Sequence, residues 1–336
     1  MQSWVNRIWY QGHWLKWLLL PLSGLFWLIS TIRRGLFNFG VKQQTQLPVP
    51  VIIVGNITAG GSGKTPTVIY LIELLRAHGY QPGVVSRGYG GNINGTAVVH
   101  TSSLASEVGD EPSLIVNRTQ VPMVVGAKRV DAANRLLSEF DVNVIISDDG
   151  LQHYALGRDI EIALVDGERR YGNQCLIPAG PLRESISRLQ TIDFVINNGA
   201  KAQGDEVPMI LEPCPPLPVS PSVSREDIPA DFDNNQPLVA MAGIGNPQRF
   251  FDSLTSQGFN LASTQAFEDH QAYSEASLIA VAGGHGLIMT EKDAVKCRGF
   301  AHKNWWYLPV NAKLTQEFDQ TLLRRLAQVA QFKKET

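Results

Sequence analysis

The stretch V-I-I-V-G-N-I-T-A-G-G-S-G-K-T-P-T, from Val51 to Thr67, decides the fold that we predict for this chain. It opens with an apolar, β-branched run, Val51–Val54, which indicates a buried strand. A glycine-rich loop, a Lys-Thr pair and a helix-like segment follow, and this order is typical of a phosphate-binding P-loop. The sequence therefore predicts an α/β fold of the P-loop NTPase kind, with a mostly parallel sheet flanked by helices.

Each residue type in the loop has a chemical reason. Glycines let backbone N–H groups turn toward phosphate oxygens without a clash from Cβ, and the start of the helix adds its positive dipole end. Lys64 can reach the β- and γ-phosphates, and the Thr65 hydroxyl can bind Mg²⁺. The expected nucleotide-binding residues are Thr58, Ala59, Gly60, Gly61, Ser62, Gly63, Lys64 and Thr65.

One spacing departs from the common P-loop pattern. That pattern places a glycine five residues before Gly63, where this chain has Thr58, and the first glycine is Gly55 instead. The tail G-S-G-K-T is intact, so we keep the nucleotide interpretation. The alternative is a glycine-rich turn between strand and helix that binds nothing.

The composition is that of a globular protein with room for two domains. The chain has 336 residues, of which 44% are apolar and 18% charged. Its net charge of −2 gives no general attraction to nucleic acid, and we predict no nucleic-acid partner. Three widely spaced cysteines argue against a disulfide framework or a zinc site and fit a reducing compartment.

Residues 1–46 form a hydrophobic N-terminal segment with five of the seven tryptophans. The sixteen residues from Trp17 to Ile32 carry no charge, whereas a spanning helix needs about twenty apolar residues. Pro21 and Gly24 also weaken a single continuous helix. We favour a helix that lies in the membrane interface; a spanning anchor and a core or oligomer helix are the alternatives.

The domain predicted for residues 47–200 places charged residues after its strands, at the edge where open α/β sheets bind ligands. Arg87 follows one such strand and can hold a phosphate through paired donors, or it is a surface residue of a tight turn. Asp148 and Asp149 follow a buried strand, as in the Walker-B arrangement that holds Mg²⁺ opposite the P-loop hydroxyl. The alternative for this pair is an acidic turn.

Two further charged groups are ambiguous from the residues alone. Asp110, in G-D-E-P, stands where a helix N-cap belongs, so capping is the favoured interpretation and a general base is the alternative. Arg183 and Glu184 follow two prolines and a glycine, which make a rigid loop that can present both charges. That signal is weak by itself.

The second half of the chain begins with an extended linker, predicted for 201–236, that contains an edge strand near Met209. A second, smaller α/β domain is predicted for 237–336 and ends in an amphipathic helix. Within it, His270 follows a strand beside Asp269, and such a pair can serve as a general base, although a histidine in a turn is more often polar surface. Lys292 contacts a substrate phosphate or is an ordinary solvated charge at a helix start.

The motifs, taken together, resemble those of the tetraacyldisaccharide 4′-kinases, the lipid A 4′-kinases of the lipopolysaccharide pathway. They occur in this order: G-N-I-T-A-G-G-S-G-K-T-P, S-R-G-Y-G, G-D-E-P, D-D-G-L-Q-H, P-A-G-P-L-R-E, F-E-D-H-Q-A-Y and T-E-K-D-A-V-K. The resemblance covers nearly the whole chain, and the displaced first glycine is how this family writes its P-loop. It implies transfer of the ATP γ-phosphate to the 4′-hydroxyl of an acylated glucosamine disaccharide phosphate.

The resemblance also implies a cellular site and a set of residue roles. It implies a monotopic enzyme on the cytoplasmic face of the inner membrane, with ATP and Mg²⁺ as cofactors and no obligate protein partner. The implied roles are phosphate and metal contacts for Lys64 and Thr65, carboxylates near Mg²⁺ for Asp148 and Asp149, and active-site contacts for Arg183 and Glu184.

The implied base unit is Asp110 with His270. Many members of the family have a second histidine after the first, where this chain has Gln271. His270 is therefore the sole histidine candidate in that motif.

Two other functions compete with a lipid kinase. One is a membrane-associated P-loop ATPase or GTPase that switches a protein partner, which would hydrolyse nucleotide without any lipid acceptor. The other is a non-catalytic scaffold docked at the membrane with a relic P-loop. The intact Lys64, Thr65, Asp148 and Asp149 argue against a scaffold.

Overall fold

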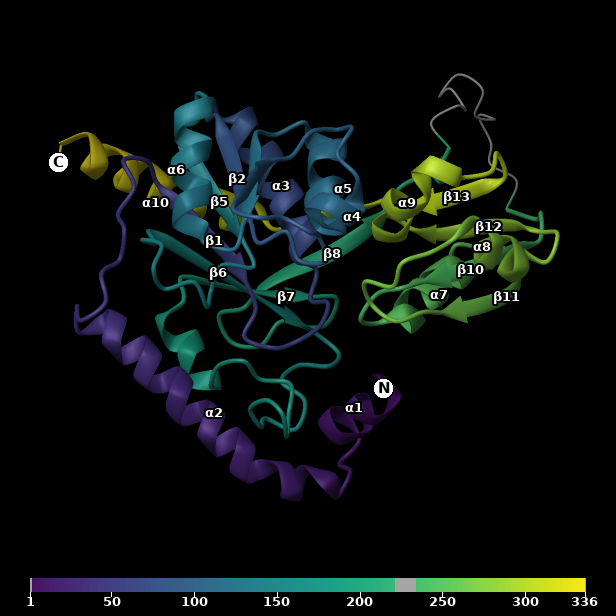
Figure 1. The fold of residues 1–336 in the computed structure, drawn as a ribbon, viewed down its shortest axis with the longest axis horizontal. Coiled ribbons are helices and arrows are strands. Elements are labelled where there is room, and N and C mark those ends of the chain that lie inside the picture. Colours follow the sequence, from purple (N-terminus) through teal and green to yellow (C-terminus); the bar gives the residue numbers. More distant parts are fainter. Residues whose placement is uncertain (1, 221–233, 336) are drawn as a thin grey trace.

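Two sheets organise the chain in the computed structural model, which describes residues 2–220 and 234–335 (Figure 1). Within these residues, a nine-stranded sheet has the order β14-β8-β7-β6-β1-β5-β2-β4-β3, and a five-stranded sheet has the order β11-β10-β12-β13-β9. We call each sheet with its helices the large lobe and the small lobe. The predicted α/β fold with a mostly parallel sheet is confirmed.

The strands of the large sheet are parallel except at its two edges, where β3 and β14 run antiparallel to their neighbours. They are β1 (Val51–Gly55), β2 (Pro82–Ser86), β3 (Thr96–Val98), β4 (Met123–Gly126), β5 (Val144–Asp148), β6 (Ile160–Asp166), β7 (Phe194–Asn198), β8 (Val207–Pro213) and β14 (Val310–Lys313). The central strands are buried along their whole length because helices cover both faces of the sheet.

Alternation along β1 divides the core of the large lobe into two layers. Ile52 and Val54 pack on one face and Val51 and Ile53 on the other, because successive side chains of a strand point to opposite faces. The helices of this lobe are α3 (Lys64–Ala77), α4 (Ala105–Val108), α5 (Asp110–Thr119), α6 (Arg129–Glu139) and α10 (Gln316–Glu335), with a 3₁₀ helix at Ile186–Thr191. Helices α3, α5 and α10 cover the first face, and α6 covers the second.

The small lobe is a second α/β unit built on a short, mostly parallel sheet. Its elements are β9 (Leu217–Pro218), β10 (Leu238–Ala242), β11 (Leu261–Ala266), β12 (Gly286–Thr290), β13 (Trp305–Leu308), α7 (Pro247–Ser256), α8 (Glu275–Ala282), α9 (Glu291–Cys297) and a 3₁₀ helix at Arg298–Phe300. Its carboxyl strand ends face the large lobe, so residues that follow β11 and β12 reach the P-loop side of the molecule.

The chain passes between the lobes at positions that the predicted domain ranges do not mark. The expected linker, 201–236, contributes β8 to the large sheet and β9 to the small one, while its residues 221–233 lie outside the described residues. The range 237–336 returns to the large lobe at its end, where β14 pairs with β8 and α10 packs into the core. The apolar side chains Leu322 and Leu326 explain this return, since both are fully buried against the large sheet.

The N-terminal segment forms α1 (Gln2–Tyr10) and α2 (Leu15–Asn38), and α2 runs along the outside of the large lobe (Figure 1). It is one continuous helix across Pro21, contrary to the expected interruption. Proline lacks the N–H of one intrahelical hydrogen bond and its ring crowds the carbonyl four residues earlier, yet α2 continues through Pro21. Helix α2 is long and apolar enough to cross a membrane by length and composition, and Ser23 is the only one of its side chains that is buried.

Candidate active site

The P-loop connects β1 to α3 and needs glycine for its shape. Gly60 and Gly63 have φ values of 110° and 92°, in the left-handed region that favours glycine. A Cβ at Gly63 would also lie 2.5 Å from Nδ2 of Asn198, which donates a hydrogen bond to the Ser62 carbonyl at 3.1 Å. The loop therefore keeps its backbone N–H groups open for an anion, with Asn198 as a support that the sequence did not reveal.

Lys64 points from the start of α3 into the space between the P-loop and β5. Its Nζ donates to Asn56 Oδ1 at 3.3 Å and lies 3.7 Å from Asp149 Oδ1. Asn56 in turn donates to the Gly60 carbonyl, so the lysine and the loop are fixed by the same side chain. Thr65 follows Lys64 and lines the same cavity.

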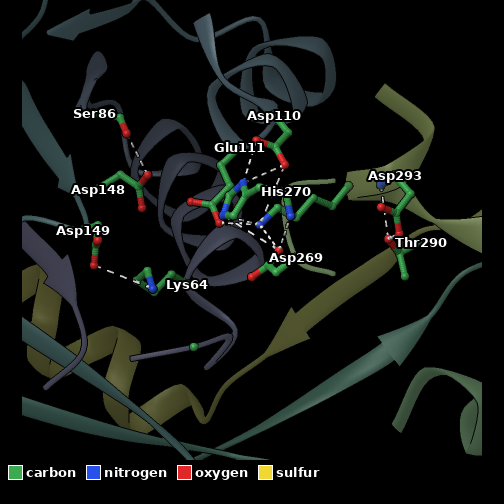
Figure 2. Close-up of polar contacts among 12 residues, drawn as sticks. Lys64, Ser86, Asp110, Glu111, Asp148, Asp149, Asp269, His270, Thr290 and Asp293 are labelled. Atoms are coloured by element: carbon green, nitrogen blue, oxygen red, sulfur yellow. Dashed lines mark hydrogen bonds and ion pairs between the residues drawn. The ribbon is translucent and has the colours of Figure 1, made fainter. Parts of the chain in front are cut away.

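Asp148 and Asp149 point to different partners, as predicted, although Asp149 lies in the turn just after the strand and not on it (Figure 2). Asp148 ends β5 and accepts a hydrogen bond from the Ser86 hydroxyl at 3.1 Å. Asp149 has a φ of 48° and accepts from Arg183 Nη1 at 3.1 Å. A non-glycine residue in this conformation is strained, and such strain is found where function fixes a side chain.

The two carboxylates differ in electrostatics. Burial, together with the charges of Glu111 and Asp149, raises the pKa of Asp148 to about 7. Burial also opposes ionisation of Asp149, but the charges of Lys64 and Arg183 outweigh it and lower the pKa of Asp149 to about 2. The anion of Asp149 is therefore stabilised, whereas the charges of Lys64 and Arg129 do not offset the burial and repulsion that oppose ionisation of Asp148.

These residues fit a magnesium ion shared with a phosphate. Oδ1 of Asp148 is buried and has no hydrogen-bond partner within the described residues, so a cation at this point would satisfy it. The described residues contain no group of three or more His, Cys, Asp or Glu that could enclose a metal. Mg²⁺ does not need such a group, because it is usually held by one or two carboxylates, waters and substrate phosphates.

Arg183 and Glu184 lie beside this pair and the P-loop. Arg183 binds Asp149, and its backbone N–H donates to the Ile57 carbonyl at 2.7 Å. Glu184 is buried and accepts hydrogen bonds from Gln152 Nε2 at 3.0 Å and from the Tyr154 hydroxyl. Gln152 also donates to the Asn56 carbonyl, which connects Glu184 to the loop.

Asp110 and His270 come from different lobes and meet in the centre of the site (Figure 2). Nδ1 of His270 lies 3.1 Å from both carboxylate oxygens of Asp110. The capping interpretation of Asp110 is wrong: α5 begins at Asp110, Gly109 occupies the N-cap position, and no side-chain cap hydrogen bond forms there. The aspartate is free to pair with histidine because the glycine, at a φ of 96°, makes the turn into the helix.

The ionised form of Asp110 is strongly favoured. Burial raises the pKa of this carboxyl, but the hydrogen bond from His270 and the charges of Lys292 and Lys296 outweigh burial and lower the pKa to about 2. Lys292 lies 3.9 Å and Lys296 3.6 Å from Oδ2 of Asp110. His270 itself has a φ of 62°, a second strained position in the site.

A single cavity of about 850 Å³ joins these groups. The P-loop, the Asp148–Asp149 pair, Arg183, Glu184 and His270 all line it. Helix α2 contributes Phe26, Ile29 and Arg33 to another part of its wall. Nucleotide-binding features and the exposed apolar helix therefore share one space.

The model of the LpxK family, tetraacyldisaccharide-1-P 4′-kinase, matches residues 15–327. The chain belongs to this kinase family. It is 66% identical to the tetraacyldisaccharide 4′-kinase of Shewanella frigidimarina over 334 residues, which are 99% of this chain and 98% of that protein. It is 62% identical to the enzyme of the same name from Shewanella baltica over equal shares.

A solved member of the family has the same fold. The crystal structure described as the "apo" form of LpxK from Aquifex aeolicus in complex with ATP is 29% identical, with a TM-score of 0.77. The match covers 93% of this chain and 99% of that one. The resemblance inferred from the motifs is confirmed, and these relatives give no support to a switch ATPase or a scaffold.

Several residues of the site were not singled out by sequence reasoning. Glu111, Lys296 and Ser86 touch the predicted residues, and Gln152 and Tyr154 hold Glu184. A signal for Lys296 exists in T-E-K-D-A-V-K, because lysines four residues apart lie on one face of a helix. No comparable signal marks Ser86, whose role depends on the pairing of β2 with β5.

Asp148→Asn is expected to stabilise the ligand-free protein at neutral pH. The raised pKa means that wild-type stability falls as pH rises from about 4 through 7, because a buried, repelled carboxylate must ionise. We expect the amide to raise the free energy of unfolding above pH 7 by about 2–4 kcal/mol, and the gain to vanish near pH 4. Urea unfolding without Mg²⁺ or nucleotide, at several pH values, measures this.

Asp149→Asn is the matched control, with the opposite sign. The pKa of Asp149 is lowered, so its anion stabilises the protein above pH 4, and the amide should lower stability at neutral pH. A loss of stability in Asp148→Asn at neutral pH would contradict the electrostatic account of this pair.

Proposed function

We propose that this chain transfers the γ-phosphate of ATP to the 4′-hydroxyl of a tetraacylated glucosamine disaccharide 1-phosphate, a step of lipid A biosynthesis. The observation that carries the proposal is the shared cavity: the P-loop, Asp148, Asp149 and His270 line it together with an apolar helix, and Asp110 lies 3.1 Å from Nδ1 of His270. Family membership and the ATP complex of the Aquifex aeolicus relative support the choice of donor and acceptor.

The nucleotide part of the site has a role for each predicted residue. The N–H groups of residues 60–63 and Lys64 would bind the phosphates, and Thr65, Asp148 and Asp149 would hold Mg²⁺, which would neutralise charge on the transferring phosphoryl group. Arg183 keeps Asp149 ionised and in place. Phosphoryl transfer needs mainly such positioning and charge stabilisation.

His270 and Asp110 form the base unit. Nε2 of His270 accepts the proton of the acceptor hydroxyl, and Asp110 stabilises the imidazolium that forms, since its own pKa of about 2 makes it a poor proton acceptor. Glu184 holds Gln152 and Tyr154 at the cavity wall and so shapes the acceptor side of the site.

A cationic part of the wall fits the second anionic group of the acceptor. Arg33 and Arg87 line the cavity, and neither forms an ion pair within the described residues. Burial and the charges of Arg129, Arg33 and Arg87 lower the pKa of His153 to about 4, which reports a positive potential there. A phosphate on the far sugar would compensate this charge.

Helix α2 is best explained as an interfacial anchor. Trp17, Leu18 and Leu25 expose more than half of their surface, and the segment before Glu73 contains no acidic residue. The Ser23 hydroxyl donates to the Leu176 carbonyl and accepts from the Ala179 N–H. If α2 spanned the bilayer, the irregular loop that contains Leu176 and Ala179 would enter the hydrocarbon, where its backbone groups would lack hydrogen-bond partners.

We infer that the protein is anchored on the cytoplasmic face of the inner membrane, where both ATP and the lipid acceptor are accessible. Lys16 and Arg34, near the two ends of α2, would face anionic headgroups. The acyl chains of the acceptor can then remain in the bilayer while the sugar enters the cavity.

Acceptor-dependent phosphate transfer tests the proposed function. Purified protein with γ-labelled ATP and Mg²⁺ in detergent micelles should label a disaccharide lipid and release little free phosphate without it. Asp110→Ala should lower kcat by about 10²–10⁴-fold with little change in the KM for ATP, because the base acts on the acceptor.

Asp205→Ala, which removes an exposed acid outside the cavity, is the control and should keep wild-type rates. Rapid hydrolysis of ATP without any lipid would favour a nucleotide switch instead. Equal loss of kcat and ATP affinity in a folded Asp110→Ala protein would contradict the base role.

Substitutions on the exposed face of α2 test the membrane anchor. The double change Leu18→Asp and Leu25→Asp should abolish cosedimentation with anionic phospholipid vesicles and raise the KM for the lipid acceptor, with the KM for ATP unchanged. The control is Ile279→Asp, an exposed helical residue of the small lobe. Full retention of vesicle binding by the double variant would exclude α2 as the anchor.

A further inference from the structure

Helix α9 carries two lysines, Lys292 and Lys296, that the proposed reaction does not yet use. They are one helical turn apart on one face, and both side chains are largely buried. Their Nζ atoms lie 3.9 Å and 3.6 Å from Oδ2 of Asp110, so two cations of the small lobe flank the carboxylate of the large lobe.

Lys292 contacts the three carboxylates near His270, those of Asp110, Glu111 and Asp269. Its Nζ donates to Glu111 Oε1 at 3.0 Å and to Asp269 Oδ1 at 3.1 Å, and it lies 3.4 Å from His270 Nε2. An ammonium group has three N–H donors and no lone pair. A hydrogen bond across the 3.4 Å contact requires Nε2 of His270 to be the acceptor.

This contact determines where the ring proton of His270 lies. A neutral imidazole has one N–H and one lone pair, so a lone pair on Nε2 places the proton on Nδ1. Nδ1 is the atom that lies 3.1 Å from both oxygens of Asp110 and donates to them. Lys292 and Asp110 thus select the same tautomer from opposite sides of the ring.

We propose that Lys292 is a positioning residue that keeps the ring proton of His270 on Nδ1, so that Nε2 presents a lone pair to the acceptor hydroxyl. The inference rests on the proposed function of this site. Lys292 lies closer to Glu111 and Asp269 than to Nε2 of His270. An arriving hydroxyl therefore displaces the ammonium from Nε2, while the hydrogen bonds to the two carboxylates keep the lysine in place.

The charges around His270 show why a cation is needed. Asp110 of α5, Asp269 of its own loop and Lys292 of α9 contact it, and the Tyr89 ring packs edge-on at 4.9 Å. Glu111 and Lys296 lie just behind these groups, paired with Lys292 and Asp110 respectively. Without Lys292, three carboxylates would face one remaining lysine. That surplus of negative charge favours the imidazolium, which cannot accept a proton.

The backbone of α9 is anchored independently of these contacts. Asp293 is completely buried and accepts hydrogen bonds from the Thr290 hydroxyl at 2.6 Å, the Tyr273 hydroxyl at 2.8 Å and the Gly243 N–H at 2.9 Å. Lys296 pairs with the same carboxylate at 3.1 Å. Removing the charge of Lys292 should therefore leave the helix in place.

Nitrogen NMR of protein labelled with ¹⁵N-histidine tests the proposal directly, with the His270 signals assigned by their loss in His270→Gln. In the wild type near neutral pH we expect protonated Nδ1 and unprotonated Nε2. Lys292→Met should shift His270 toward imidazolium or toward a proton on Nε2. An unchanged pattern in Lys292→Met, or a wild type that already carries its proton on Nε2, would overturn the proposal.

Steady-state kinetics gives a second test of the proposal. Lys292→Met should lower kcat at least about tenfold with the KM for ATP nearly unchanged, and should move the acid limb of the kcat/KM profile to higher pH. Lys292→Arg should restore part of the rate, since it keeps the charge and the donors. The control, Lys313→Met, removes an exposed lysine paired with Glu212 outside the site.

A lower rate with an unmoved pH profile would show a merely structural role and would overturn the proposal. The proposed function fails separately, if the wild type itself shows no acceptor-dependent transfer. The NMR result for Lys292 is independent of that outcome, because it requires no substrate.

Discussion

The hydrogen bond between Asp110 and His270 is the contact on which the rest of the site depends. The two residues lie 160 positions apart in the sequence and on different lobes, yet the carboxylate and the imidazole meet at 3.1 Å. In the proposed base unit neither residue suffices alone: an ionised, buried aspartate binds protons weakly, and a histidine without an orienting partner has no fixed tautomer. The fold must therefore hold two sheets in one arrangement.

Three features of the fold fix that arrangement. The pairing of β8 with β14 returns the chain from the small lobe to the large sheet, and α10 fastens this return into the core. Arg118 of α5 donates to Glu291 of α9 at 2.7 Å and to the Val310 carbonyl, so the helices that carry Asp110 and Lys292 are tied together. The Arg169 guanidinium binds the Gly245 carbonyl, close to the P-loop.

Much of this architecture could be predicted because its signals are local. The strand before the P-loop, the glycines and the acidic pair at the end of β5 are read directly from adjacent residues, and Arg183 binds the second acid of that pair, Asp149. What could not be predicted depends on distant pairing. The return of residues 310–335 to the large sheet required knowledge of which apolar face remained uncovered.

Asp110 shows the limit of local reasoning most clearly. Its position before a helical pattern favoured an N-cap, and its pairing with His270 becomes visible only when the two lobes are seen together. The same holds for Glu111 and Lys296, whose charges gain meaning from residues more than 150 positions away. For α2, the expectation that a proline interrupts a helix was wrong, since the helix continues through Pro21.

A double-mutant cycle in kcat tests the central claim most directly, that Asp110 and His270 act as one unit. Asp110→Asn, His270→Gln and the combined variant would be compared in acceptor-dependent transfer, with folding checked by circular dichroism. The account predicts that the double variant is scarcely slower than the slower single variant, because either change disables the same base. If the fold-reduction in kcat of the double variant equals the product of the two single reductions, the account is contradicted.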